Sequence, residues 1–151
     1  MAAATNISAF TEAITRAGLR STRQRHQVFE ALLEKRDHPT AVEVFLRVKK
    51  NIPTISLATV YSCLETLTGV GLVRHVNLER QSARYCPNLD EHGHFFCDVC
   101  GAVYDVPVKH GRSIEEAFDL PPATELSFHS VTLRGRCQSC VGSKTSHHRK
   151  S

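Results

Sequence analysis

Two pairs of cysteines with the same internal spacing constrain the fold of this chain more than any other feature of its sequence. Two residues separate Cys97 from Cys100 and Cys137 from Cys140, and Gly101 follows the first pair where a tight turn is needed. Two thiolates at this spacing bind one tetrahedral Zn²⁺, and two such pairs complete its coordination. We therefore predict a structural Zn²⁺ that holds the intervening chain at both ends and leaves no ligand position for a substrate.

Disulfide bonds and a thioredoxin-like redox site are the alternatives for these cysteines. The doubling of the motif and the lack of a βαβ pattern around it favour zinc. The N-terminus lacks the basic start and apolar block of a signal peptide, and no apolar run approaches the roughly 18 residues of a membrane span. We therefore expect a cytoplasmic protein with reduced thiols and no membrane partner.

Helical periodicity fills the first seventy residues of the chain. Apolar stripes recur in four stretches, with capping residues at Ser21, Thr40 and Ser56. After Gly71 the period changes to alternation, with a polar turn at 79–82 between two short strands. Helices followed by a hairpin are the order of a winged helix-turn-helix, in which the helix from Ser56 would enter the major groove of DNA. Plain protein-binding modules also have this order, so the pattern alone leaves both interpretations open.

The remaining sequence predicts a small unit of mixed helix and strand. Strands are expected at 93–97 and 102–108, a short helix at 113–118 and a third strand at 125–134. So few elements bury only a thin core, and such a unit needs a metal ion or a second copy of itself to be stable.

Charge is distributed unevenly along the chain. Residues 1–86 carry 12 Lys and Arg against 7 Asp and Glu, whereas residues 87–151 carry 7 against 8. The positive half is the one expected to meet phosphate, although charge scattered over a solvated surface gives the same count.

A second candidate metal site lies around His92 and His94. In an extended chain, residues two apart project from one face, so both imidazoles could bind one ion. Surface histidines at this spacing also occur without a metal. His38 is distant in sequence and lies just before the helix that Thr40 is expected to cap. Its imidazole could supply a further ligand. Other potential ligands occur close to the histidine pair in sequence: Cys86, Asp90, Glu91 and Asp105.

Several of these motifs follow one another in a recognisable order. They are GLRSTRQR at 18–25, HPTA at 38–41, SLATVY at 56–61, HGH at 92–94 and the CxxCG knuckle at 97–101. Together they closely resemble the ferric uptake regulator family over roughly residues 9–140. The resemblance implies a homodimeric, metal-responsive repressor that binds a double-stranded DNA operator.

The resemblance also implies the organisation of the chain. An α+β fold is expected, with an N-terminal winged helix-turn-helix DNA-binding domain at 1–86. A small α/β dimerisation and metal-sensing domain with the Cys₄ zinc site would follow at 87–142. The composition of residues 143–151 predicts a disordered tail.

Family roles carried over onto matching positions give two metal sites. The structural zinc falls on the four knuckle cysteines. The regulatory metal site, for Fe²⁺, Mn²⁺ or Zn²⁺, falls on a mixed set of side chains: His38, Cys86, His92, His94 and Asp105. An additional metal site of the family is matched only by His129 and Glu91, because Gly93 stands where an acidic or His side chain often contributes. We do not expect a third ion.

Candidate DNA contacts come from the second and fourth helical stretches. We expect Arg20, Arg23 and Arg25 to bind phosphate, and Thr59 and Tyr61 to reach base or sugar edges. Tyr61 could instead pack on the hairpin. Ser62 replaces the basic residue common in the family, which leaves fewer phosphate contacts on this helix.

The resemblance leaves the effector open. Asp105 is typical of peroxide sensors, in which Fe²⁺ reacts with peroxide and a ligand such as His38 or His92 is oxidised, so we expect an iron- and peroxide-responsive regulator. Peroxide-responsive members, however, have Asp where this chain has Cys86. A thiolate suits Zn²⁺ better than Fe²⁺, and zinc-responsive relatives use a Cys in this stretch. A zinc-uptake repressor with Cys86 as sensor ligand is therefore the alternative, and oxidation of Cys86 itself is a third hypothesis.

Two other classes of protein compete with a regulator. A zinc-dependent hydrolase would need a three-ligand zinc, with Glu91 as a general base, in a pocket for which the sequence offers few aromatic side chains. A zinc-ribbon adaptor would not bind DNA at all. We rank both below the regulator and do not expect an enzyme.

Overall fold

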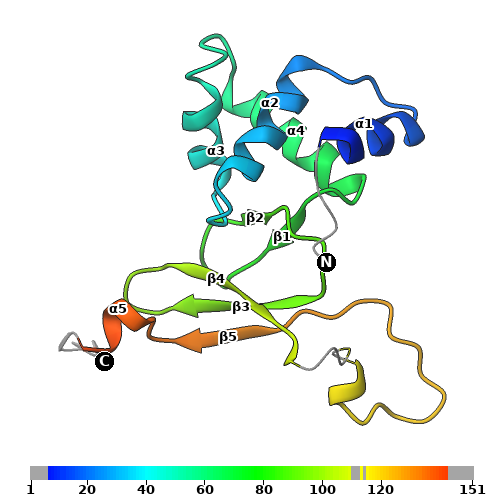
Figure 1. The fold of residues 1–151 in the computed structure, drawn as a ribbon, viewed down its shortest axis with the longest axis vertical. Helices are drawn as coiled ribbons and strands as arrows, with labels where there is room; N and C mark the ends of the chain where they lie inside the picture. Colours follow the sequence, from blue (N-terminus) through cyan, green and yellow to red (C-terminus); the bar gives the residue numbers. More distant parts are fainter. Residues whose placement is uncertain (1–6, 110–112, 114, 143–151) are drawn as a thin grey trace. The chain divides into compact units, whose positions relative to one another are not determined.

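The chain folds into two compact units, Met1–Asp90 and Glu91–Ser151. This computed structural model describes residues 7–109, 113 and 115–142. The first unit is mainly helical with a two-stranded sheet, and the second contains a three-stranded sheet (Figure 1). The predicted α+β fold class is therefore confirmed. Within the described residues, no helix has the length and apolar character needed to cross a membrane. The predicted disordered tail, 143–151, lies outside the described residues.

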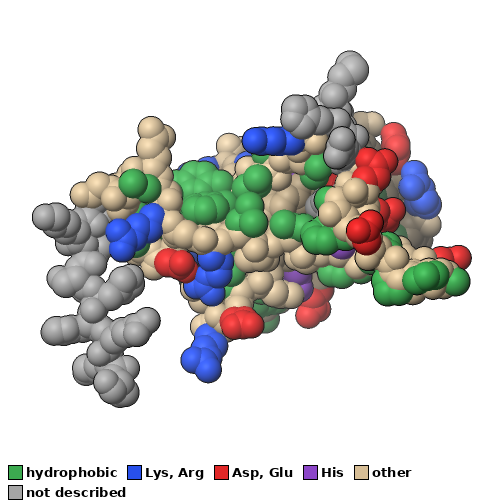
Figure 2. Space-filling model, turned by 90° about the horizontal axis from the view of Figure 1, so that it is seen from below, with side chains coloured by type: hydrophobic (Ala, Val, Ile, Leu, Met, Phe, Trp, Pro, Cys, Tyr) green, Lys and Arg blue, Asp and Glu red, His purple; other side chains and the backbone are tan. Residues whose placement is uncertain are grey.

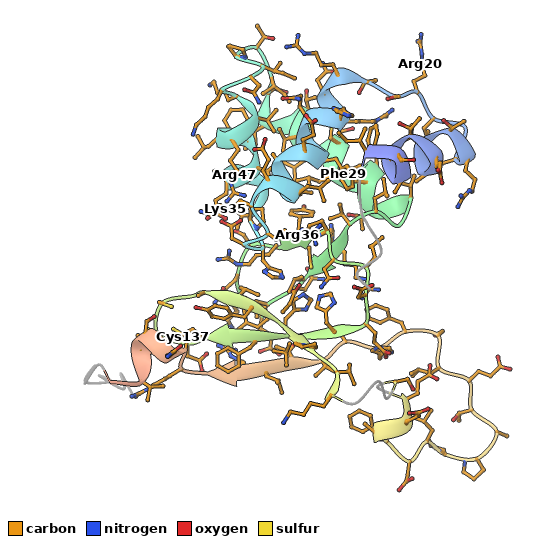
Figure 3. The ribbon with its side chains drawn as sticks, viewed as in Figure 1. Arg20, Phe29, Lys35, Arg36, Arg47 and Cys137 are labelled. Carbon is orange, nitrogen blue, oxygen red and sulfur yellow. The ribbon has the colours of Figure 1, made fainter. Side chains whose placement is uncertain are left out.

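Four helices make up most of the first unit. They are α1 (Ile7–Arg16), α2 (Arg23–Glu34), α3 (Ala41–Val48) and α4 (Leu57–Gly69). Each helix buries an apolar face, and the four faces meet in one core. Phe29 of α2 is fully buried in that core, where its ring stacks on Phe10 of α1 (Figure 3). Hydrophobic burial is therefore the main source of stability for this unit.

Side-chain caps fix where three of these helices begin. At α4 the predicted cap, Ser56, accepts the Thr59 N–H at 3.1 Å. At α3 the Thr40 hydroxyl accepts the Glu43 N–H, and the Glu43 carboxylate accepts the Thr40 N–H at 2.7 Å, which is a complete capping box as predicted. At α2 the predicted cap, Ser21, is one residue too early. Thr22 caps the helix instead, because its hydroxyl is the one that accepts the Arg25 N–H.

A β-hairpin follows α4 and completes the winged helix-turn-helix. Strands β1 (Arg74–Val76) and β2 (Arg84–Cys86) pair antiparallel, with Arg74 opposite Cys86. The loop before α3 also pairs with the hairpin, since the Tyr85 N–H donates to the Pro39 carbonyl at 3.0 Å. The hairpin is thus attached to the start of the helix-turn-helix.

The second unit is a three-stranded sheet with short helical turns. Its elements are β3 (His92–Cys97), β4 (Val103–Pro107), the 3₁₀ turn η2 (Glu115–Ala117), β5 (Thr132–Gly135) and α5 (Gln138–Val141). The strand order is β4-β3-β5, with β4 antiparallel and β5 parallel to β3. Figure 1 shows a long irregular connection between β4 and β5.

Two sequence predictions for this unit need correction. The helix expected at 113–118 is only the 3₁₀ turn, and the strand expected at 125–134 begins at Thr132. The alternation of apolar and polar residues at 125–131 predicted a strand, but alternation does not supply a pairing partner. The β3 ladder starts at His94 opposite Thr132, and within the part of the chain that the structure describes no strand pairs with residues 125–130.

Candidate metal centres

The topology of the second unit brings the four knuckle cysteines together. Cys97 ends β3, and Cys137 directly precedes α5, just after β5. Because β3 and β5 run parallel, the C-terminal ends of these two strands lie at the same end of the sheet. Gly101 makes the knuckle turn with a φ of +73°, where its N–H donates to the Cys97 carbonyl. Figure 3 shows Cys137 at this end of the unit.

The sulfur geometry fits a tetrahedral zinc. The sulfurs of Cys97, Cys100, Cys137 and Cys140 all lie within 4.8 Å of one another, and the Cys100 and Cys137 sulfurs are 3.7 Å apart. A Zn–S bond of about 2.3 Å places tetrahedral sulfurs about 3.8 Å apart, whereas a disulfide requires about 2.05 Å. All four are free thiols. The cluster is therefore arranged as a set of metal ligands rather than as disulfides.

Hydrogen bonds make these four thiols ionise unequally. The backbone N–H groups of Cys100 and Cys137 lower the pKa of the Cys97 thiol to about 6. Burial raises the pKa of Cys137, but hydrogen bonds from Cys140 and Cys100 outweigh it and lower the pKa overall. The hydrogen bond with Cys137 raises the pKa of Cys140 to about 12. Neighbouring thiolates repel one another, so full ionisation of the cluster favours a bound cation.

An ion pair that sequence reasoning missed braces the same knuckle. Arg134 of β5 donates from Nε and Nη2 to the Asp98 carboxylate at 2.9 and 2.6 Å, and the Asp98 N–H donates to the Gly135 carbonyl at 2.8 Å. Asp98 is one of the two residues between the knuckle cysteines, so this pair holds the turn against β5. The sequence does contain a signal for this ion pair: an acidic residue lies inside the first knuckle, and an arginine lies just before the second cysteine pair.

Strand register builds a second cluster from His92, His94 and Asp105. The two histidines share one face of β3, and Asp105 lies directly opposite His94 on β4. Their Nε2 atoms are 3.1 Å apart, and the Asp105 Oδ1 atom lies 3.3 Å from His92 and 3.6 Å from His94. Ligands about 2.1 Å from a metal ion are about 3.0–3.4 Å apart in octahedral or tetrahedral geometry. These three donors therefore fit one side of a metal coordination sphere.

The other two predicted regulatory ligands belong to the first unit. His38 and Cys86 are both buried, and their ligand atoms lie within 4.8 Å of each other. The attachment of the loop before α3 to β2 accounts for this proximity, because Cys86 directly follows Tyr85. Each unit thus carries its own group of potential ligands: an imidazole and a thiol in the first, two imidazoles and a carboxylate in the second.

The two matched residues of the additional site lie close together. His129 Nε2 lies 3.3 Å from a carboxylate oxygen of Glu91. A Cβ atom at Gly93 would meet the Val131 side chain and carbonyl oxygen at 3.2 Å. This close backbone approach accounts for the glycine, which contributes no side-chain ligand to the site.

The candidate DNA contacts differ in how available they are. Arg20 extends away from the loop between α1 and α2 (Figure 3), and Arg23 at the start of α2 is also exposed. Arg25 is half-buried and donates to the Arg20 carbonyl at 2.5 Å. Thr59 lies 2.8 Å from the capping hydroxyl of Ser56. The side chain of Tyr61 on α4 is 45% exposed. Arg20, Arg23 and Tyr61 are therefore the most accessible, whereas Arg25 and Thr59 also shape the local backbone.

Large apolar side chains are exposed on the second unit. Figure 2 shows hydrophobic groups spread over one face between charged side chains. Phe128 is 80% exposed, the largest value for an exposed hydrophobic side chain in the described part of the chain. The other exposed residues lie on β4, on β5, in the connection between them and on α5: Tyr104, Phe118, Leu120, Leu126, Leu133 and Val141. Such a surface is typical of a protein–protein interface.

Comparisons with known proteins agree with this architecture. A sequence model of the Ferric uptake regulator family matches residues 16–133. The peroxide-responsive repressor PerR of Staphylococcus aureus is 28% identical over 127 residues, which cover 84% of this chain and 86% of that protein. The Vibrio cholerae ferric uptake regulator Fur superposes with a TM-score of 0.69 at 25% identity, over 85% of this chain and 99% of that one. The Helicobacter pylori Fur structure, described as having three functional metal binding sites, has the same fold, with a TM-score of 0.72 at 18% identity over 92% and 93% of the two chains.

Proposed function

Because the chain belongs to the ferric uptake regulator family, we propose that it acts in the cytoplasm as a homodimeric repressor whose binding to a two-fold symmetric DNA operator depends on a regulatory metal ion. Proteins of this family are metal-responsive transcriptional regulators rather than enzymes, so the hydrolase alternative is set aside. DNA binding is assigned to residues 1–86, and dimerisation and metal sensing to residues 87–142. The exposed apolar side chains of the second unit support dimerisation through that unit.

The four knuckle cysteines are proposed to hold the structural Zn²⁺. Bound zinc supplies a cross-link between the ends of β3 and β5, which otherwise share only a short ladder. Four protein ligands fill a tetrahedral ion, so this site stabilises the second unit and takes no part in chemistry.

One regulatory ion is proposed to take ligands from both units. His38 and Cys86 would bind it from the first unit, and His92, His94 and Asp105 from the second. The observation that carries this proposal is the convergence of the second unit's three donor atoms at 3.1–3.6 Å. An ion held by both sets stabilises only those arrangements of the two units in which the sets meet, which links metal binding to the spacing of the two DNA-binding units of a dimer.

DNA would be bound through α4 in the major groove. Its Tyr61 side chain is exposed for a base or sugar contact, and Thr59 lies on the same helix. Arg20, Arg23 and Arg25, in α2 and the loop before it, are proposed to bind phosphates. Such contacts predict that operator affinity falls steeply as salt concentration rises.

Iron or manganese with a response to peroxide is the effector we favour. Similarity to the peroxide-responsive repressor supports it, as does the carboxylate of Asp105 beside two imidazoles, a donor set that suits Fe²⁺ and Mn²⁺. The second candidate is zinc, favoured by the buried thiol of Cys86, which is a softer donor than a carboxylate.

A titration of operator binding tests these assignments. A duplex would first be selected from a random library, and the dimer carrying only structural zinc would then be mixed with it in the presence of Mn²⁺, anaerobic Fe²⁺ or Zn²⁺. We expect Mn²⁺ and Fe²⁺ to activate binding, peroxide to release the iron form, and Cys86→Asp to retain activation. Activation by zinc alone, lost in Cys86→Asp, would establish the zinc-uptake alternative.

Ligand variants separate the regulatory ion from unrelated histidines. His92→Ala should abolish metal-dependent binding, because it removes a donor from the centre of the cluster. His26→Ala is the matched control, since His26 lies on α2 beside Glu30, remote in sequence from every proposed ligand. No DNA binding under any metal or salt condition would instead support the zinc-ribbon adaptor.

A further inference from the structure

The loop at residues 37–40, here called the His38 loop, is held in an unusual backbone conformation. His38 has a φ of +53°, a region that few residues other than glycine adopt. The next residue is Pro39, so the chain here cannot relax into a helix. A loop of this kind keeps its shape only where neighbouring groups hold it.

Two arginines hold this loop: Arg47 of α3 donates to the Asp37 carboxylate at 2.7 Å, and Arg84 of β2 bonds the backbone of His38 itself. The Arg84 Nη1 donates to the His38 carbonyl at 2.9 Å, across 46 residues of sequence. Backbone contacts flank it, because the Tyr85 N–H donates to the Pro39 carbonyl and Thr40 forms a β-bridge with Arg84. Only a fifth of the Arg84 side chain is exposed, so the bond is shielded from water.

The same guanidinium also reaches the start of α3. Arg84 Nη1 lies 3.8 Å from Glu43 Oε2, the oxygen that accepts both the N–H and the hydroxyl of Thr40 in the capping box. Arg84 therefore connects the His38 carbonyl to the carboxylate that caps the first helix of the helix-turn-helix. Sequence reasoning gave it no role, because a single arginine in a strand carries no recognisable motif.

We propose that Arg84 is a positioning residue for the regulatory metal: it keeps the His38 imidazole beside the Cys86 thiol and couples that pair to the capping box of α3. The inference rests on the proposed function, since it assumes that His38 and Cys86 bind an ion. Arg84, which bonds the His38 carbonyl, is separated from Cys86 by a single residue along β2, so displacement of the strand, the loop or the α3 cap moves the other two. Hydrogen-bonded supports of metal ligands typically change metal affinity by about 10- to 100-fold when removed.

The test uses the full-length protein with its structural zinc in place and Co²⁺ as the probe for the regulatory site. Co²⁺ affinity is measured by absorption for the wild type, Arg84→Gln, Arg84→Lys and two controls. Arg36→Gln removes the same charge from an exposed side chain two residues before His38. Val48→Ala destabilises the first unit through its core, at a position outside the His38 loop. Amide hydrogen exchange at Tyr85 is measured in the absence of Co²⁺.

We expect Arg84→Gln to lose at least about tenfold in Co²⁺ affinity and to speed exchange of the Tyr85 amide, with partial recovery in Arg84→Lys, which retains a charged donor. Arg36→Gln and Val48→Ala should stay within about twofold of wild-type affinity. Wild-type affinity in Arg84→Gln, or an equal loss in either control, would overturn the proposal. If Arg84→Gln does not fold, Arg84→Lys decides between the same outcomes.

Failure of the proposed function gives a different result. In that case the wild type itself binds no Co²⁺ beyond the structural site, and the metal-positioning role falls with it. The exchange measurement still shows whether Arg84 holds the His38 loop, because it is made without the probe ion.

Discussion

The two units of this protein are stabilised by different kinds of core. In the first, side chains from four helices and the hairpin, among them Phe29, Leu32 and Leu64, form one continuous apolar cluster. In the second, the cluster of buried residues around the knuckles consists of three cysteines, with Phe95, Val99 and Ala102 packed against it. The first core is mainly hydrocarbon, whereas the second is built around thiols whose arrangement fits a metal ion.

The contrast between the two cores explains how a sheet of three short strands can become a stable domain. Burial of apolar area contributes about 25 cal/mol per Å², and the second unit exposes several of its largest apolar side chains instead of burying them. Its thiols and its exposed hydrophobic surface can therefore have complementary roles, since a metal would join the two knuckles and a second copy of the chain would cover exposed apolar side chains.

Removal of the structural metal should change the stability of the second unit more than any other treatment, with little effect on the first. Zinc binding supplies about 10–16 kcal/mol in small zinc domains, so a strong chelator should unfold the second unit while the four helices of the first persist. Two-dimensional NMR would show collapse of the amide signals from β3, β4 and β5 only. Persistence of the β-sheet signals without zinc would show that the second unit does not depend on a metal for its fold.

A cysteine substitution gives the same test without a chelator. Cys137→Ser should reduce bound zinc to a small fraction of one ion per chain, because it removes one of four ligands. Cys63→Ser is the matched control, since burial in the α4 core raises the pKa of that thiol and keeps it neutral. Equal zinc loss in both variants would contradict the assignment.

Truncation of the helical core should have the opposite distribution of effects. Phe29→Ala removes a fully buried ring and is expected to lower the free energy of unfolding of the first unit by about 3–5 kcal/mol. Zinc content should stay at the wild-type value. The chain contains no Trp, so urea unfolding would be followed by circular dichroism, and Leu46→Ala on the exposed side of α3 serves as control. Loss of zinc in Phe29→Ala would mean that the two cores are not independent.

The sequence predicted most of the first unit because its signals are local. Apolar periodicity located the helices, and the capping box at Thr40 and Glu43 fixed where α3 begins. The doubled knuckle likewise predicted which four cysteines converge, since their spacing is itself the geometric requirement. Where a choice lay between adjacent hydroxyls, as at Ser21 and Thr22, the pattern could not decide, because the cap depends on which hydroxyl reaches the Arg25 amide.

Long-range contacts are what the sequence could not supply. The strand expected at 125–134 was too long because alternation reports exposure and not the presence of a partner strand. Arg84 bonds the carbonyl of His38, 46 residues away, and Asp98 bonds the guanidinium of Arg134, 36 residues away. These contacts exist only once the sheets have formed.

Loss of a helix cap should affect the first unit alone and by a smaller amount. Thr40→Ala removes the hydroxyl that accepts the Glu43 N–H, and we expect it to lower the free energy of unfolding by about 1 kcal/mol. Thr54→Ala, at an exposed position before Ser56, should change it by less than about 0.5 kcal/mol. Thermal unfolding of both variants checks this, and a difference in zinc content between them would argue against separate cores.

The smallest expected effect is a pH dependence that distinguishes the units. Burial alone would raise the pKa of Asp37, but hydrogen bonds and charge from Arg47 and Lys35 outweigh it and lower the pKa. The ionised carboxylate therefore stabilises the first unit above the unfolded-state pKa, and this contribution is lost as pH falls through the folded-state value. With 35% of the side chain exposed, Asp37→Asn should cost no more than about 1 kcal/mol at neutral pH and nothing at a pH below the folded-state pKa. Glu34→Gln, an exposed change at the end of α2, is the control.

Acid should act on the two units in a definite order. Thiolate ligands release zinc when protonated, so we expect the second unit to unfold before the stabilisation from Asp37 is fully lost in the first unit. The reverse order of unfolding would show that the helical core, and not the zinc cluster, limits stability in acid.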